Sequence, residues 1–121
     1  MAHVKAVTTD WARDVVERTI AALEPHTDPE RAAGAFAYMK GVAPFIGISA
    51  PDRRKFLRAA WATLHEPTSN QLGRAALALM RLPQREYHYA AYDLIERYIK
   101  FADAKFLSTF GEQLLTTTPW W

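Results

Sequence analysis

A basic run near the middle of the chain is the strongest candidate for chemistry. It consists of Arg53, Arg54, Lys55 and Arg58. Pro51 and Asp52 precede it and are typical of a helix start, because proline loses no hydrogen bond at the first helical position and aspartate complements the positive helix end. Guanidinium and ammonium groups gathered on the first turns of a helix are suited to binding phosphate. The run therefore predicts a site for an anionic partner.

The charge distribution along the chain supports this prediction. The net charge is only +2, but residues 40–85 hold eight basic and two acidic side chains. Residues 1–39 and 86–121 are both net acidic. A positive belt on a nearly neutral protein indicates a polyanionic partner such as nucleic acid. A solvated face whose charges are balanced by acidic groups from other helices is the alternative.

Other motifs for catalysis or metal binding are absent from the sequence. It has no cysteine, no Gly-rich phosphate loop, no GxSxG and no His-Glu-x-x-His, and its histidines lack ligand spacing: His3, His26, His65 and His88. We therefore predict no cofactor and no metal site. His88 is expected to face solvent. Asp93 and Arg97 have the i, i+4 spacing of a helical ion pair, so we interpret them as structural.

Length and composition bound the class of protein. The chain has 121 residues, of which 50% are hydrophobic, enough for one folded domain without disulfide or metal staples. No apolar run approaches the roughly 20 residues of a membrane helix, and no signal-peptide core is present. We expect a soluble cytoplasmic protein with no membrane partner.

Hydrophobic periodicity predicts helices throughout. We expect six, over about 10–24, 29–40, 51–64, 69–81, 83–98 and 104–116. Pro119 predicts the start of a seventh helix. Thr9 and Asp103 are predicted N-caps, and Pro83 is predicted at a first helical position. Expected inward stripes include Ala32, Ala35, Phe36 and Met39 in the second helix, and Phe106, Leu107, Phe110 and Leu114 in the sixth. Gly34 suggests a close approach between helices.

Short loops between these helices imply antiparallel neighbours, so we predict one all-α domain over residues 1–121. The helix pairs are expected to stack as an α-solenoid of the HEAT kind. Trp120 and Trp121 place a large apolar surface at the end of the sequence. We therefore expect the N-terminal part of a larger domain, whose exposed end would associate with another copy.

The connection before the basic run has an unusual composition. Gly41, Pro44 and Gly47 interrupt the helical periodicity, whereas Phe45 and Ile46 are too apolar for a solvated loop. We expect this connection to pack against the core. An ordered set of motifs includes it: Tyr38-Met39-Lys40, Phe45-Ile46-Gly47-Ile48, Pro51-Asp52-Arg53-Arg54, Leu82-Pro83-Gln84-Arg85-Glu86-Tyr87 and Trp120-Trp121. From about residue 30 onward the set resembles the N-terminal half of the AlkD family, DNA alkylation repair glycosylases built from HEAT-like repeats.

The resemblance implies excision of alkylated bases, such as N3-methyladenine and N7-methylguanine, from double-stranded DNA held in a positively charged groove. It implies that six residues belong to the DNA-binding region: Tyr38, Lys40, Pro51, Arg53, Arg54 and Arg58. Trp121 corresponds to a cleft tryptophan that precedes the catalytic aspartate by four residues, so that aspartate would follow this sequence. We therefore expect the chain alone to be inactive. Ala50 stands where the family often has threonine.

Two other functions fit the same architecture. One is a DNA-binding protein without catalysis, and the other is a protein-binding HEAT-repeat scaffold. Salt dependence separates DNA binding from neutral protein recognition, because phosphate contacts release counterions.

Overall fold

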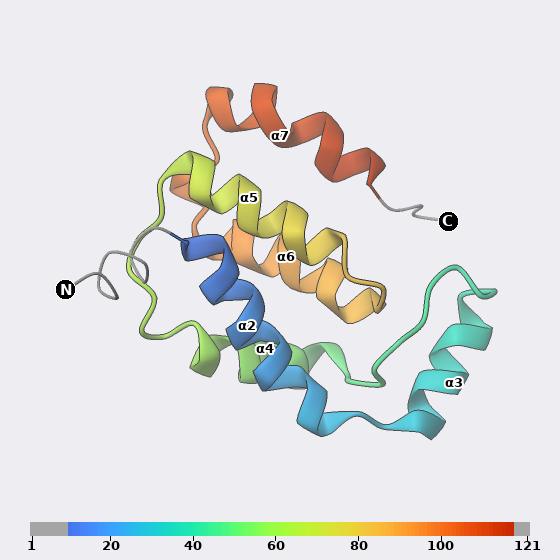
Figure 1. The fold of residues 1–121 in the computed structure, drawn as a ribbon. Helices are drawn as coiled ribbons and strands as arrows, with labels where there is room; N and C mark the ends of the chain where they lie inside the picture. The colour runs from blue at the N-terminus through green and yellow to red at the C-terminus, as the bar shows by residue number, and fades with distance from the viewer. Residues whose placement is uncertain (1–9, 118–121) are drawn as a thin grey trace.

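The protein is all-α. A computed structural model describes residues 10–117 and shows an α-solenoid-like packing of helices (Figure 1). The α-helices are α2 (Trp11–Leu23), α3 (Pro29–Tyr38), α4 (Ala50–Ala60), α5 (Ser69–Met80), α6 (Arg85–Arg97) and α7 (Ala104–Thr116). Short 3-10 turns follow α2 and α6, over Glu24–His26 and Ile99–Phe101. The predicted all-α class is confirmed, and no strand occurs in the described part of the chain.

Side-chain caps fix most of the helix starts. Asp28, Ser49 and Asp103 each accept a hydrogen bond from the backbone N–H three residues later. Thr68 and Gln71 form a reciprocal capping box at the start of α5. Asp10 caps α2 by accepting from the Arg13 N–H, whereas the predicted cap, Thr9, lies outside the described residues.

The core is organised around α5, which packs against α2, α6 and α7. Its inward stripe is fully buried, comprising Leu72, Ala75, Ala76, Leu79 and Met80. Figure 1 shows α5 and α6 running antiparallel through the middle of the molecule, with α2 and α4 on one side and α7 on the other. Gly73 allows α7 to approach closely, because a Cβ at this position would lie 2.2 Å from the Phe110 ring.

Three predicted helix boundaries were wrong. Helix α4 ends at Ala60 rather than near Leu64, because the chain turns at Trp61. Helix α6 begins at Arg85 after Gln84, so Pro83 lies before the helix. Pro51 occupies the second position of α4, because Ser49 is the cap and Ala50 begins the helix. No described helix is long and apolar enough to span a bilayer. The seventh helix predicted at Pro119 lies outside the described residues.

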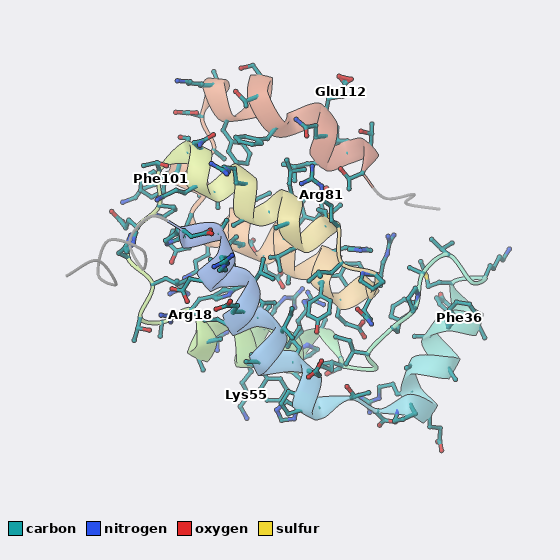
Figure 2. All side chains as sticks on the ribbon, in the orientation of Figure 1. Arg18, Phe36, Lys55, Arg81, Phe101 and Glu112 are labelled. Atoms are coloured by element: carbon teal, nitrogen blue, oxygen red, sulfur yellow. The ribbon has the colours of Figure 1, made fainter. Side chains whose placement is uncertain are left out.

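Helix α3 stands apart from the other helices and buries none of its residues (Figure 2). The predicted inward stripe is therefore wrong: Phe36 is exposed, and its other members are only half-buried. Gly34 meets no neighbour that a Cβ would contact, so it marks no close approach. In α7 the prediction failed at Leu107, which is 61% exposed, because α5 covers only one side of that helix.

The connection between α3 and α4 packs against the core, as predicted. Ile46 is buried, and its carbonyl accepts a hydrogen bond from the Asp28 N–H at 2.9 Å. Gly47 has φ of 98° and leaves no space for a side chain, because a Cβ would lie 2.3 Å from the Asp28 carbonyl oxygen. Only glycine satisfies both constraints.

Candidate nucleic-acid interface

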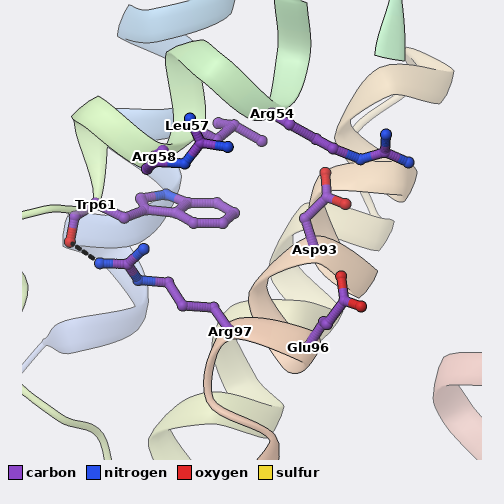
Figure 3. Close-up of a pocket in the computed structure, with 7 residues that line it drawn as sticks. All are labelled: Arg54, Leu57, Arg58, Trp61, Asp93, Glu96 and Arg97. Carbon is purple, nitrogen blue, oxygen red and sulfur yellow. Dashed lines mark hydrogen bonds between the residues drawn. The ribbon is translucent and has the colours of Figure 1, made fainter. Parts of the chain in front are cut away.

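Helix α4 brings two cations of the basic run to one cleft. Arg54 and Arg58 are one turn apart, both are exposed, and both line a cleft of about 260 Å³ between α4 and α6 (Figure 3). Leu57 and Trp61 are buried beside them and supply an apolar floor. Two guanidinium groups over such a floor can bind phosphate oxygens by charge-assisted hydrogen bonds.

Helix α6 supplies the facing wall of this cleft, through Asp93, Glu96 and Arg97 (Figure 3). The Arg97 Nη2 donates to the Trp61 carbonyl oxygen at 3.4 Å, and its Nε donates to the Tyr98 hydroxyl. Arg97 therefore links the end of α4 to α6. These three residues were not predicted as site residues, because nothing in the sequence placed α6 opposite α4.

Arg53 differs from its neighbours, because it is buried and paired with a carboxylate. Its Nε lies 2.7 Å from Oδ2 of Asp93, and its guanidinium lies 5.2 Å from the centre of the Tyr89 ring. The predicted Asp93–Arg97 pair was therefore wrong, since the tertiary packing of α4 on α6 gives Asp93 a closer partner. The pair offsets the charge of Asp93, which would otherwise repel an anion in the cleft.

Glu86 holds the connection that leads into α4. Its carboxylate is 2% exposed and accepts hydrogen bonds from three backbone N–H groups: Ile46 at 2.8 Å, Gly47 at 2.8 Å and Ile48 at 3.2 Å. The neighbouring Arg85 N–H donates to the Pro44 carbonyl oxygen at 2.8 Å. The first turn of α6 thus fixes where α4 begins, and with it the position of Arg54 and Arg58.

The remaining predicted DNA-binding residues lie outside the cleft. Tyr38 is 84% exposed at the end of α3, and Lys40 follows with φ of 56°. Pro51 is exposed at the start of α4. Trp121 lies outside the described residues. The structure therefore places Arg54 and Arg58 together, while the roles of Tyr38, Lys40 and Pro51 in binding stay predictions.

The positive belt of the sequence is divided among several surfaces. Lys55 lies on the other flank of α4, in a groove shared with α2. Arg74 and Arg81 are exposed on or next to α5, and Arg85 is buried. The folded chain therefore presents local groups of cations rather than one continuous band.

His88 was predicted to face solvent, but it is 2% exposed. Its Nε2 lies 2.6 Å from the Leu82 carbonyl oxygen. Because a carbonyl only accepts, Nε2 carries the proton of the neutral ring. Nδ1 is buried and has no hydrogen-bond partner among the described residues. Burial is the main cause that lowers the pKa of His88 below its ordinary value of 6.5.

This lowered pKa predicts a loss of stability in acid. As the pH falls through 6.5, the unfolded chain takes up a proton at His88 before the folded chain does, so protonation favours unfolding. The free energy of unfolding is therefore unaffected by His88 above that pH and falls below it. We expect His88→Gln to reduce the pH dependence of the unfolding free energy between pH 7.5 and 5. The difference should be at most about 1.4 kcal/mol per pH unit. Urea denaturation at several pH values measures this pH dependence. If the unfolding free energy changed equally with pH in both proteins, the lowered pKa of His88 would be contradicted.

No group of His, Asp and Glu in residues 10–117 has the arrangement of a metal site. The cleft therefore combines three arginines, an apolar floor, the paired carboxylate of Asp93 and the exposed carboxylate of Glu96.

Comparison with known proteins decides the family. A family model described as DNA alkylation repair enzyme matches residues 19–121, which is most of the chain. The chain belongs to the DNA alkylation repair enzyme family. The matched region of this DNA alkylation repair protein includes α3 to α7 and both walls of the α4–α6 cleft. No curated protein matches the chain. A role in DNA alkylation repair, with DNA as the partner, follows from membership of the family.

Proposed function

We propose that this chain is the N-terminal DNA-binding part of a glycosylase that excises alkylated bases such as N3-methyladenine and N7-methylguanine. Family membership supports a role in alkylation repair. The observation that carries the DNA-binding assignment is the pair Arg54 and Arg58, both exposed at the α4–α6 cleft. HEAT-like repeats belong to the same proposal, since the helices pack in a solenoid-like way.

In this proposal the described residues bind the duplex and do not break the glycosidic bond. Arg54 and Arg58 contact backbone phosphates, Arg53 offsets the charge of Asp93, and Glu86 positions the start of α4. The resemblance puts the catalytic aspartate four residues after Trp121. Alkylation gives the base a positive charge and makes it a better leaving group, and as the base departs positive charge develops on the sugar, which a carboxylate can stabilise. We therefore expect the 121-residue chain to bind DNA without releasing bases.

Removing both cleft arginines tests the binding assignment. We expect Arg54→Ala with Arg58→Ala to weaken binding to duplexes of different sequence equally, because phosphate contacts carry little sequence information. The slope of log Kobs against log salt should become shallower by about 0.9 for each phosphate that the variant no longer neutralises. Fluorescence anisotropy of a labelled duplex between 50 and 200 mM salt, roughly the range in which such effects are large, measures both changes.

Arg13→Ala with Lys105→Ala is the matched control, because it removes the same charge from exposed positions at the starts of α2 and α7. An equal change in slope for both double variants would contradict a specific role of the cleft. If the chain did not bind DNA but bound a protein with an affinity that does not depend on salt, the protein-binding scaffold would be favoured instead. For the enzymatic part, a protein extended beyond Trp121 is incubated with DNA containing N7-methylguanine. A folded, DNA-binding extension that releases no base would refute the glycosylase proposal.

A further inference from the structure

A second hollow lies on the opposite flank of α4 from the proposed duplex site. It is a groove of about 580 Å³ between α2 and α4, within the range of roughly 300–1,000 Å³ typical of ligand sites. Arg54 and Arg58 face the α4–α6 cleft, whereas Lys55 and Phe56 line this groove. Helix α4 therefore separates two sites, and duplex binding at the cleft leaves the groove unexplained.

An aromatic pair forms one wall of the groove. The rings of His26 and Phe56 are stacked, with centroids 3.9 Å apart and planes inclined by 9°. Phe56 is half-buried and His26 is exposed, so a ligand in the groove can reach the imidazole ring of the stack. The floor consists of small side chains: Ala21, Ala22, Ala59 and Ala60. These small side chains leave room for a planar ring beside the stack.

Arg18 and Lys55 line the same groove (Figure 2). No carboxylate is among the lining residues in the part of the chain that the structure describes. Arg18 is held in place, because its Nε donates to the Asp14 carboxylate at 2.9 Å and its Nη1 donates to the Ala60 carbonyl and the Thr63 hydroxyl. The ion pair with Asp14 offsets part of the Arg18 charge, so Lys55 is the main cation of the groove. Lys55 is exposed and forms no ion pair within residues 10–117. Its ammonium group can reorient to meet a phosphate.

We propose that the α2–α4 groove binds a nucleotide, with the base stacked on the His26–Phe56 pair and the phosphate at Lys55 and Arg18. A stacking surface beside cations is the combination with which proteins bind unpaired nucleotides without reading their sequence. Paired bases inside a duplex do not offer a free ring face, so the groove favours single strands. The ligand is either a nucleotide unit of a single strand or a free nucleotide. An acidic peptide would use the cations but would gain nothing from the stack.

The test uses the whole 121-residue chain and a fluorescein-labelled single strand of eight deoxyadenosines, followed by anisotropy. We expect His26→Ala and Lys55→Ala each to weaken binding by at least about fivefold, because the first removes the stacking surface for a base and the second removes a cation that binds phosphate. Both residues are exposed, so neither substitution should unfold the protein. Lys105→Ala is the matched control and should leave single-strand binding unchanged, because it removes one exposed cation of α7 that lines neither the cleft nor the groove.

Competition with adenosine 5′-monophosphate distinguishes a free nucleotide from a nucleotide unit of a single strand as the ligand. Displacement of the strand supports a free nucleotide as ligand, and lack of displacement supports the strand itself. No binding of the labelled strand, or binding that depends on Arg58 but not on His26, would overturn the proposal. A peptide of eight glutamates that binds with dependence on Lys55 alone would also overturn it. The duplex measurements stand independently, so failure at the groove is distinguishable from failure of the proposed function.

Discussion

Glu86→Ala is expected to lower the free energy of unfolding by about 3–5 kcal/mol, the largest effect of any single substitution considered for this protein. The carboxylate accepts three hydrogen bonds from the backbone of the α3–α4 connection, at 2.8, 2.8 and 3.2 Å. The substitution leaves the N–H groups of Ile46, Gly47 and Ile48 without their acceptor. Two of these bonds are buried, so water cannot replace the acceptor without cost.

Glu86→Gln separates the hydrogen bonds from the general loss of a side chain. Its single carbonyl oxygen can still accept from Gly47 and Ile48, but its NH₂ group would face the Ile46 N–H. We expect an intermediate loss of stability. Urea denaturation measures both variants, and Glu112→Ala, at an exposed position of α7, is the matched control that should change stability by less than about 0.5 kcal/mol. A Glu86→Ala protein as stable as this control would contradict the role assigned to the carboxylate.

This prediction bears on function, because the α3–α4 connection leads directly into the helix that carries Arg54 and Arg58. If Glu86 fixes the start of α4, its removal should also weaken duplex binding, even though Glu86 itself is too buried to contact DNA. Binding measured at a temperature where the variant remains folded distinguishes this displacement from unfolding.

Gly73→Val is expected to destabilise the protein by about 2–3 kcal/mol, through overpacking between α5 and α7. A Cβ at position 73 would lie 2.2 Å from Cδ2 and 2.5 Å from Cγ of Phe110, so the ring cannot move aside without displacing α7. Among the described helices α7 packs chiefly on α5, so little else holds it in place. In the Gly73→Val protein, hydrogen exchange should therefore be faster at the amides of α7 than at those of α2.

Gly34→Ala is the matched control for this substitution. It also replaces a glycine inside a helix, but a Cβ there meets nothing within 4 Å. It should stabilise the protein by about 0.5–1 kcal/mol, because alanine loses less backbone freedom on folding. If thermal denaturation showed the same change for both variants, the close contact between Gly73 and Phe110 would not control stability.

The sequence predicted the helices well where local chemistry decides their ends. The predicted cap Asp103 is the cap of α7, and the predicted starts at residues 29 and 69 match those of α3 and α5, which Asp28 and Thr68 cap. The apolar pattern of α5 matches its burial, although Gly73 and Leu77 are buried as well, because α2, α6 and α7 all pack against this central helix. Prediction failed for α3, whose apolar spacing is similar but which stands apart from the other helices.

For the candidate site, the sequence indicated the cations but not their surroundings. Arg53, Arg54 and Lys55 are equivalent in sequence, yet the first is buried against Asp93, the second lines the α4–α6 cleft and the third lines the α2–α4 groove. Consecutive residues on a helix point about 100° apart, so their neighbours depend on which helices pack on each side.

By itself, the sequence determined the all-α class, most helix starts and the basic run at α4, because capping, periodicity and charge are local properties of the chain. Only the tertiary structure decided the partners of the charged groups. Glu86 binds the α3–α4 connection, and Asp93 binds Arg53. In each case about 40 residues separate the partners along the chain, so the sequence gives no sign of the contact. The energy of a buried charge depends on the groups that surround it, and those are known only once the helices are packed.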